Sequence, residues 1–110
     1  MVDGNIKREV VTLIRLGEAL KYNKKHYEAL EYFDKALNKF KEDKINNHLD
    51  FAFQHIGKCL MELGRLDEAE KNFIEAYKLR ELKGDTSLIK STKQALCLVK
   101  RLKSNNSLLN

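Results

Sequence analysis

Apolar residues recur along most of the chain at steps of three and four, which is the spacing of one face of an α-helix. Four segments carry this pattern, and they follow one another as two pairs. The apolar positions of the first pair are Ile6, Val10, Leu13, Leu16 and Leu20, followed by Tyr27, Leu30, Phe33, Ala36, Leu37 and Phe40. Those of the second pair are Phe53, Ile56 and Leu60, followed by Ala69, Phe73, Ala76 and Leu79. The pattern therefore predicts four amphipathic helices.

The second pair repeats the first at a distance of forty residues. The residues that coincide at this shift are Gly17 with Gly57, Leu20 with Leu60, Glu28 with Glu68, Ala29 with Ala69, Phe33 with Phe73, and Ala36 with Ala76. Self-similarity at a fixed period indicates a repeat architecture. We expect repeat one at about 8–43 and repeat two at about 48–83, each an antiparallel pair of helices joined by a short turn.

Turn and capping residues mark the ends of these helices. Asn23 fits the break between the first two helices, because asparagine tolerates the left-handed backbone conformation. Gly64 and Gly84 follow the third and fourth helices, as expected of C-terminal caps. A fifth, capping helix is expected at about 86–103, and 104–110 is expected to be a flexible tail.

Two glycines lie in the middle of predicted helices, where glycine costs about 1 kcal/mol relative to alanine. That cost is understandable if a second helix crosses close to Gly17 and to Gly57. Phe33 and Phe73 are then expected to fill the gap between the helices. Together these features predict a single all-α domain over 1–103, an antiparallel helix-pair array (an α-solenoid) of two repeats plus a C-terminal capping helix.

At these residues the sequence resembles the tetratricopeptide repeat family. The family signature places a large residue and Leu-Gly on the first helix, and Ala-x-x-x-Phe with a further Ala on the second. The residues that carry the resemblance are Leu16, Gly17, Leu20, Ala29, Phe33 and Ala36, and then Ile56, Gly57, Leu60, Ala69, Phe73 and Ala76. The period exceeds the usual value of about 34 residues. Lys41 and Glu81 stand where a proline is usual, so the resemblance is to a long-repeat type.

The resemblance implies a non-catalytic protein–protein interaction module. In this family the first helix of each pair lines a concave groove that binds an extended peptide or a helix. The residues expected to line the groove are Ile14, Arg15, Glu18, Tyr22, Phe51, Gln54, His55, Lys58, Met61, Leu98 and Arg101. A second interpretation stays open, in which the groove is shallow and these residues pack on one another or on the tail residues Leu108 and Leu109.

Chaperone-binding members of the family clamp a C-terminal carboxylate with lysine, asparagine and arginine side chains. The matching positions of this chain carry Ile14, Glu18, His55, Ser91 and Ala95. We therefore expect no binding of chaperone tails.

The net charge of +5 comes from one end of the chain. Residues 86–110 contain no Asp or Glu, and their basic residues are Lys90, Lys93, Lys100, Arg101 and Lys103. A basic segment of this kind can bind nucleic acid or another anionic partner, which is the alternative function. It can equally be the solvated outer face of a capping helix, and this interpretation is favoured.

No catalytic or metal-binding constellation is visible. His26, His48 and His55 form no HExxH arrangement, and there is no phosphate-binding glycine loop or nucleophile elbow. Cys59 lies on the apolar stripe of the first helix of repeat two, and Cys97 lies on that of the capping helix. Both are expected to be small buried groups. We therefore expect no enzyme activity, no metal and no cofactor.

The expected partner is a protein or a peptide, with nucleic acid less favoured. A homo-oligomer is possible, because a two-repeat array exposes both of its ends. No membrane partner is expected, since no apolar run approaches the roughly 18 residues of a membrane span. Two cysteines are too few for a disulfide scaffold, so the expected location is the cytoplasm, where thiols stay reduced.

Overall fold

The computed structural model describes residues 4–43 and 47–109. Within these ranges the chain forms helices and no strands, which confirms the all-α fold class. The helices are α1 (Gly4–Tyr22), α2 (His26–Asp43), α3 (Leu49–Glu62), α4 (Leu66–Lys83) and α5 (Thr86–Leu109). None of them is both long and apolar enough to cross a membrane, as far as the described residues go.

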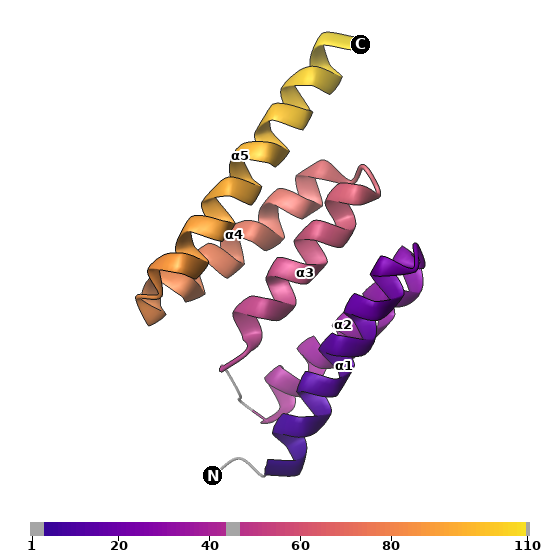
Figure 1. Cartoon of the computed structure of the whole chain (residues 1–110), viewed down its shortest axis with the longest axis vertical. Helices are drawn as coiled ribbons and strands as arrows, with labels where there is room; N and C mark the ends of the chain where they lie inside the picture. Colours follow the sequence, from indigo (N-terminus) through magenta and orange to yellow (C-terminus); the bar gives the residue numbers. More distant parts are fainter. Residues whose placement is uncertain (1–3, 44–46, 110) are drawn as a thin grey trace.

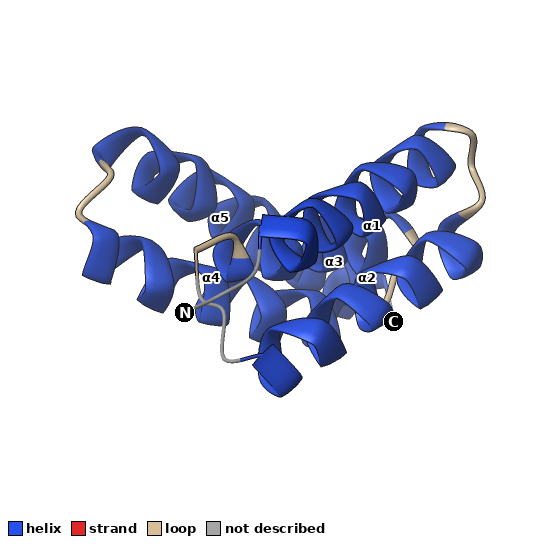
Figure 2. Ribbon diagram, turned by 90° about the horizontal axis from the view of Figure 1, so that it is seen from below, coloured by secondary structure: helices blue, strands red, loops and turns tan. Residues whose placement is uncertain are grey.

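The helices form two layers. α1 packs against α2 and α3 against α4, while α2 and α4 each also contact the next helix of the chain. Figure 1 shows the two pairs and α5 following one another along the long axis of the molecule. In Figure 2, α1 and α5 form the two arms of a V above α3, and α2 and α4 lie on the outer side. The layer of α1, α3 and α5 therefore forms the concave side of the array.

The two mid-helix glycines lie where paired helices cross closely. A Cβ atom on Gly17 would lie 2.5 Å from the Phe33 ring, and one on Gly57 would lie 2.6 Å from the Phe73 ring. Both rings are fully buried. The prediction that these aromatic rings fill the gap between paired helices is therefore confirmed, and the rings leave no room for any other residue at the two glycines.

Each helix pair is joined by the same tight turn, but the left-handed residue is not the predicted one. Lys24 has a φ of 66°, and its equivalent in the second repeat, Gly64, has a φ of 81°. The amide of the following residue, Lys25 or Arg65, then donates a hydrogen bond back to Leu20 O at 2.8 Å or to Leu60 O at 2.9 Å. The prediction that Asn23 adopts this conformation is wrong by one residue. The hydrogen bond from the Lys25 amide to Leu20 O closes the turn, and Lys24, directly before Lys25, is the residue with positive φ.

Lys24→Gly is expected to raise the free energy of unfolding by about 0.5–1 kcal/mol. The left-handed conformation costs a non-glycine residue roughly 1–2 kcal/mol, of which the greater entropy of glycine in the unfolded chain cancels part. Urea unfolding of the wild type and the variant measures the difference. Lys25→Gly is the matched control and should gain nothing, because Lys25 has no positive φ. A Lys24→Gly variant no more stable than this control would contradict the assignment of strain.

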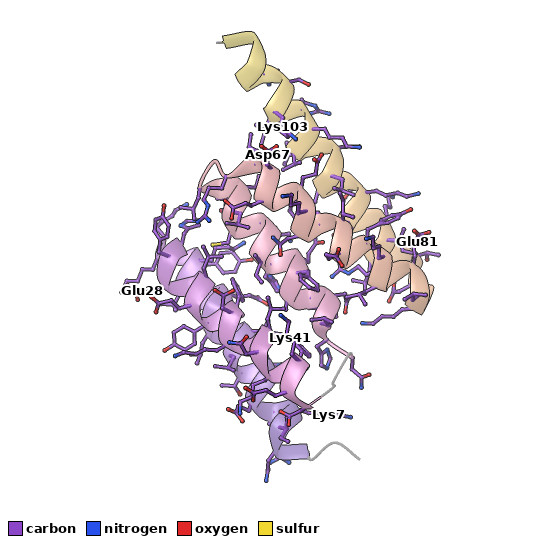
Figure 3. The ribbon with its side chains drawn as sticks, turned by 180° about the vertical axis from the view of Figure 1, so that it is seen from behind. Lys7, Glu28, Lys41, Asp67, Glu81 and Lys103 are labelled. Carbon is purple, nitrogen blue, oxygen red and sulfur yellow. The ribbon has the colours of Figure 1, made fainter. Side chains whose placement is uncertain are left out.

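Helix α5 is longer than predicted. It continues to Leu109, so the predicted end of the helix at about 103 is wrong, and the segment 104–109 of the predicted tail is helical. Ser104 stands forty residues after Gly64, at a position where a turn would need a residue that tolerates positive φ. Lys103 also holds α5 along α4, through ion pairs with Asp67 at 2.7 Å and Glu70 at 3.3 Å. Figure 3 shows Lys103 and Asp67 next to each other.

Candidate binding groove

Two hollows lie on the concave side. Hollow A lies between α1 and α3, has a cavity volume of about 220 Å³, and is lined by Val11, Ile14, Arg15, Glu18, His48, Phe51 and His55. Hollow B lies between α3 and α5 with one residue from α1, has a volume of about 440 Å³, and is lined by Lys21, Gln54, Lys58, Met61, Glu62, Ser91, Gln94, Ala95 and Leu98. Apart from His48, which directly precedes α3, both linings come from α1, α3 and α5.

The residues expected in the groove fall into these hollows, with two exceptions. Those in hollow A are Ile14, Arg15, Glu18, Phe51 and His55, and those in hollow B are Gln54, Lys58, Met61 and Leu98. Tyr22 is 74% exposed and lines neither hollow. Arg101 lines a third hollow on α5 instead. Ile14 and Gln54 are buried, so they form the floors of their hollows more than an open surface.

A neutral histidine joins α3 to α1 across hollow A. Nε2 of His55 lies 2.7 Å from Oε1 of Glu18, and the His55 ring stacks on Phe33 with centroids 5.8 Å apart. Burial, together with the nearby charges of Lys58 and Lys21, lowers the pKa of His55 to about 4. The short distance alone would also suit an imidazolium, but these effects keep the ring neutral at pH 7. Nε2 of the neutral ring is therefore the nitrogen that faces the Glu18 carboxylate and can carry the proton toward it.

Hollow B carries an excess of positive charge. Lys58 is half-buried and makes no ion pair within the described part of the chain. Burial, followed by the charges of Lys21 and Arg80, lowers its pKa below the ordinary value of 10.5. Lys21 is paired with Glu62 at 3.7 Å. Lys58 is thus a cation of hollow B with no carboxylate at ion-pair distance in the described residues, although Glu18 and Glu62 attract it from farther away.

A buried polar network beneath the groove was not foreseen. Arg80 of α4 donates from Nε to Oδ2 of Asp50 at 2.8 Å and from Nη1 to Oγ1 of Thr92 at 2.8 Å. Thr92 donates in turn to Oε1 of Gln54 at 3.1 Å, and Lys83 donates to Oδ1 of Asp50 at 2.6 Å. Asp50 is 0% and Arg80 2% exposed. The network connects α3, α4 and α5.

One sequence signal could have revealed this network. At the forty-residue shift, Asp50, Gln54 and Arg80 correspond to Val10, Ile14 and Phe40, which are buried core residues of the first repeat. Charged and polar residues that occupy core positions of a repeat must find partners inside the protein. The network is thus the polar counterpart of an apolar cluster in repeat one.

The two cysteines differ from each other. Cys59 is fully buried, as predicted, and its Sγ lies 3.3 Å from the carbonyl oxygen of His26. Cys97 is exposed, so its predicted burial is wrong. Cys97 stands at the position of Gly17 and Gly57, but no second helix covers α5 there in the described residues. No three His, Cys, Asp or Glu side chains of that part of the chain lie close enough together to hold a metal ion.

Comparison with known proteins identifies the repeats. A family model described as "Tetratricopeptide repeat" matches residues 8–81. This range begins in α1 and ends near the last turn of α4, so it takes in both helix pairs. Comparisons with curated proteins and with solved structures found no match.

Proposed function

The chain belongs to the tetratricopeptide repeat family, and we propose that its concave groove binds a peptide or a helix of a partner protein without catalysing a reaction. The family typically serves as a protein–protein interaction module. The observation that carries the proposal is the pair of hollows A and B, whose linings come from α1, α3 and α5 with His48 at the start of α3. A ligand that fills both would contact three helices that touch one another only sparsely.

The linings favour a ligand segment that combines apolar and acidic side chains. Val11 and Phe51 offer an apolar contact in hollow A, and Met61 and Leu98 offer one in hollow B. A carboxylate placed in hollow B would give Lys58 a direct ion-pair partner. Burial of a few apolar side chains, less the cost of ordering the peptide, suggests an affinity on the order of micromolar.

Location and self-association complete the proposal. Both cysteines are free, which fits a reducing compartment such as the cytoplasm.

A homo-oligomer would use the end of the array at α1, where Leu16 is 45% exposed. Its equivalent in repeat two, Ile56, is buried beside the preceding helix pair.

We expect peptides selected on the wild-type protein to bind the variant Val11→Asp about tenfold or more weakly, which corresponds to about 1.4 kcal/mol. The peptides come from a random library displayed on phage. Aspartate in hollow A removes an apolar contact and repels an acidic ligand. Fluorescence anisotropy of the synthesised peptides gives the dissociation constants.

Thr12→Asp is the matched control, because Thr12 is adjacent and exposed but lies outside hollow A. It adds the same charge and should leave peptide binding unchanged. Circular dichroism checks that both variants keep their helix content. If the selected peptides bound Val11→Asp as tightly as Thr12→Asp, the groove would not be the binding site.

A further inference from the structure

The outward face of α5 corresponds to a face that is covered in both repeats. At the forty-residue shift, Lys93, Cys97 and Lys100 correspond to Phe53, Gly57 and Leu60 of α3. In α3 this face packs against α4, and the Phe73 ring lies directly over Gly57. In α5 all of these positions are exposed. We call the surface formed by Lys90, Lys93, Cys97, Lys100 and Arg101 the open face of α5.

No helix in the described part of the chain covers this open face. α1 ends at Tyr22 and α3 at Glu62, and in each case the chain then turns back to form a second helix. The corresponding point of α5 is Leu102, but α5 continues without a turn to Leu109. In Figures 1 and 2, α5 accordingly lies at the edge of the array with α4 on one side of it.

The open face is recessed and strongly basic. It contains a hollow of about 370 Å³, which we call hollow C, lined by Lys90, Lys93, Gln94, Cys97, Leu98 and Arg101. In the described residues, none of the four basic residues of the open face forms an ion pair. Lys103 on the same helix, by contrast, is paired with two carboxylates of α4. The unpaired charge is therefore confined to the side that no helix covers.

We propose that the open face of α5 is a second binding surface, which takes an acidic amphipathic helix of a partner protein. The repeat geometry provides a position for a helix lying along α5, with Cys97 and Leu98 as its neutral floor. The surrounding lysines and arginine are complementary to Glu or Asp side chains along both edges of such a helix. Hollow C adjoins hollow B and shares Gln94 and Leu98 with it, but Cys97 and the four cations line neither hollow A nor hollow B, so this surface goes beyond the groove function proposed above.

The partner helix that binds the open face must also differ from α2 and α4 of this chain. A Cβ atom at the equivalent Gly57 would lie 2.6 Å from the Phe73 ring, and Cys97 has such a Cβ atom. An aromatic ring therefore cannot approach α5 as closely as Phe73 approaches α3. The helix that fits carries a small residue at the crossing, which excludes the Phe33 and Phe73 surfaces of another copy of the chain.

The exposed thiol of Cys97 provides the test. The probe is a synthetic helical peptide about five turns long, with alanine and leucine on one face and glutamate along both edges. Bound peptide should slow alkylation of Cys97 by N-ethylmaleimide about tenfold, a protection corresponding to about 1.4 kcal/mol. Cys59 is buried and reports that the protein stays folded. The same peptide with glutamine in place of glutamate should give no protection.

Two charge variants locate the contact. The double variant Lys93→Gln with Lys100→Gln should weaken binding of the acidic peptide about tenfold, because it removes two of the four positive charges of the open face. Lys71→Gln with Lys78→Gln removes two exposed lysines of α4 and should leave binding unchanged. Equal affinities of the two double variants, or no protection of Cys97 at any peptide concentration, would overturn the proposal.

One further variant separates a protein helix from nucleic acid. Cys97→Trp fills hollow C but keeps every charge, so it should abolish binding of the acidic helix. A single strand of deoxythymidines, which needs mainly the positive charges, is the competing probe. If the strand bound the wild type and Cys97→Trp equally well, and more tightly than the peptide, the surface would be a nucleic-acid site and the proposal would be wrong.

Discussion

Arg80→Ala is expected to lower the free energy of unfolding by about 3–5 kcal/mol. Asp50 would keep only Lys83 as a charged partner, Thr92 would lose its buried donor, and a cavity would form in place of the guanidinium. A domain of this size has a total stability of about 5–15 kcal/mol, so the variant approaches unfolding. Urea unfolding followed by circular dichroism at 222 nm measures the loss.

The control for Arg80→Ala comes from the first repeat. The double variant Asp50→Val with Arg80→Phe reproduces the pair Val10 and Phe40, which are buried in the equivalent positions. It removes both charges together, and such replacements are often neutral or stabilising. The double variant should therefore recover most of the lost stability. A double variant as unstable as Arg80→Ala would show that the network is needed for more than the pairing of its charges.

The pH dependence of the free energy of unfolding also distinguishes the wild type from the double variant. Burial alone would raise the pKa of Asp50, but the hydrogen bonds from Lys83 and Arg80 outweigh it and lower the pKa below 3.8. The stability contributed by this carboxylate is therefore present above about pH 4 and is lost as the pH falls through the lower folded-state pKa. The double variant lacks Asp50, so its stability relative to the wild type should improve in acid.

Gly57→Leu is expected to cost about 1–3 kcal/mol or more, through overpacking at the closest crossing of α3 and α4. Even a Cβ atom at this position would lie 2.6 Å from the Phe73 ring, which is fully buried and has no free space to move into. The leucine side chain would force the two helices apart. Thermal unfolding followed by circular dichroism gives the change in melting temperature.

Cys97→Leu is the matched control for this substitution. It places the same side chain at the equivalent position of α5, where no helix lies over it in the described part of the chain. We expect a change within about 0.5 kcal/mol, as for other exposed sites. Similar losses for Gly57→Leu and Cys97→Leu would contradict the close crossing as the cause.

Most of the helical framework could be predicted from the sequence, because each pattern has one physical cause. The three- and four-residue steps reflect the face that each helix buries, and the paired glycines and phenylalanines reflect the crossings. The end of α5 could not be predicted, because it depends on the absence of a turn-forming residue at Ser104 and on the ion pairs of Lys103. Ion pairs of this kind join residues far apart in sequence and leave no local pattern.

The candidate groove could be predicted only in outline. The resemblance to the tetratricopeptide repeat family placed Phe51 and Lys58 on the concave side, but it did not show that the concave side is divided into two hollows. The network of Asp50 and Arg80 was missed because charged residues are ordinarily assigned to the surface. Only a position-by-position comparison of the two repeats places these residues in the core.

The network also makes the two joints of the array unequal. The joint of α3 and α4 with α5 is held by buried hydrogen bonds through Arg80 and Thr92, whereas repeat one meets α3 through apolar side chains and the contact of Glu18 with His55. In a linear array each joint contributes its own free energy, so each joint can open on its own. Hollow A spans the joint between the two repeats, because its lining comes from α1, from α3 and from His48 just before α3. A ligand in hollow A would act as a clamp, and its binding energy would be coupled to the closing of the array.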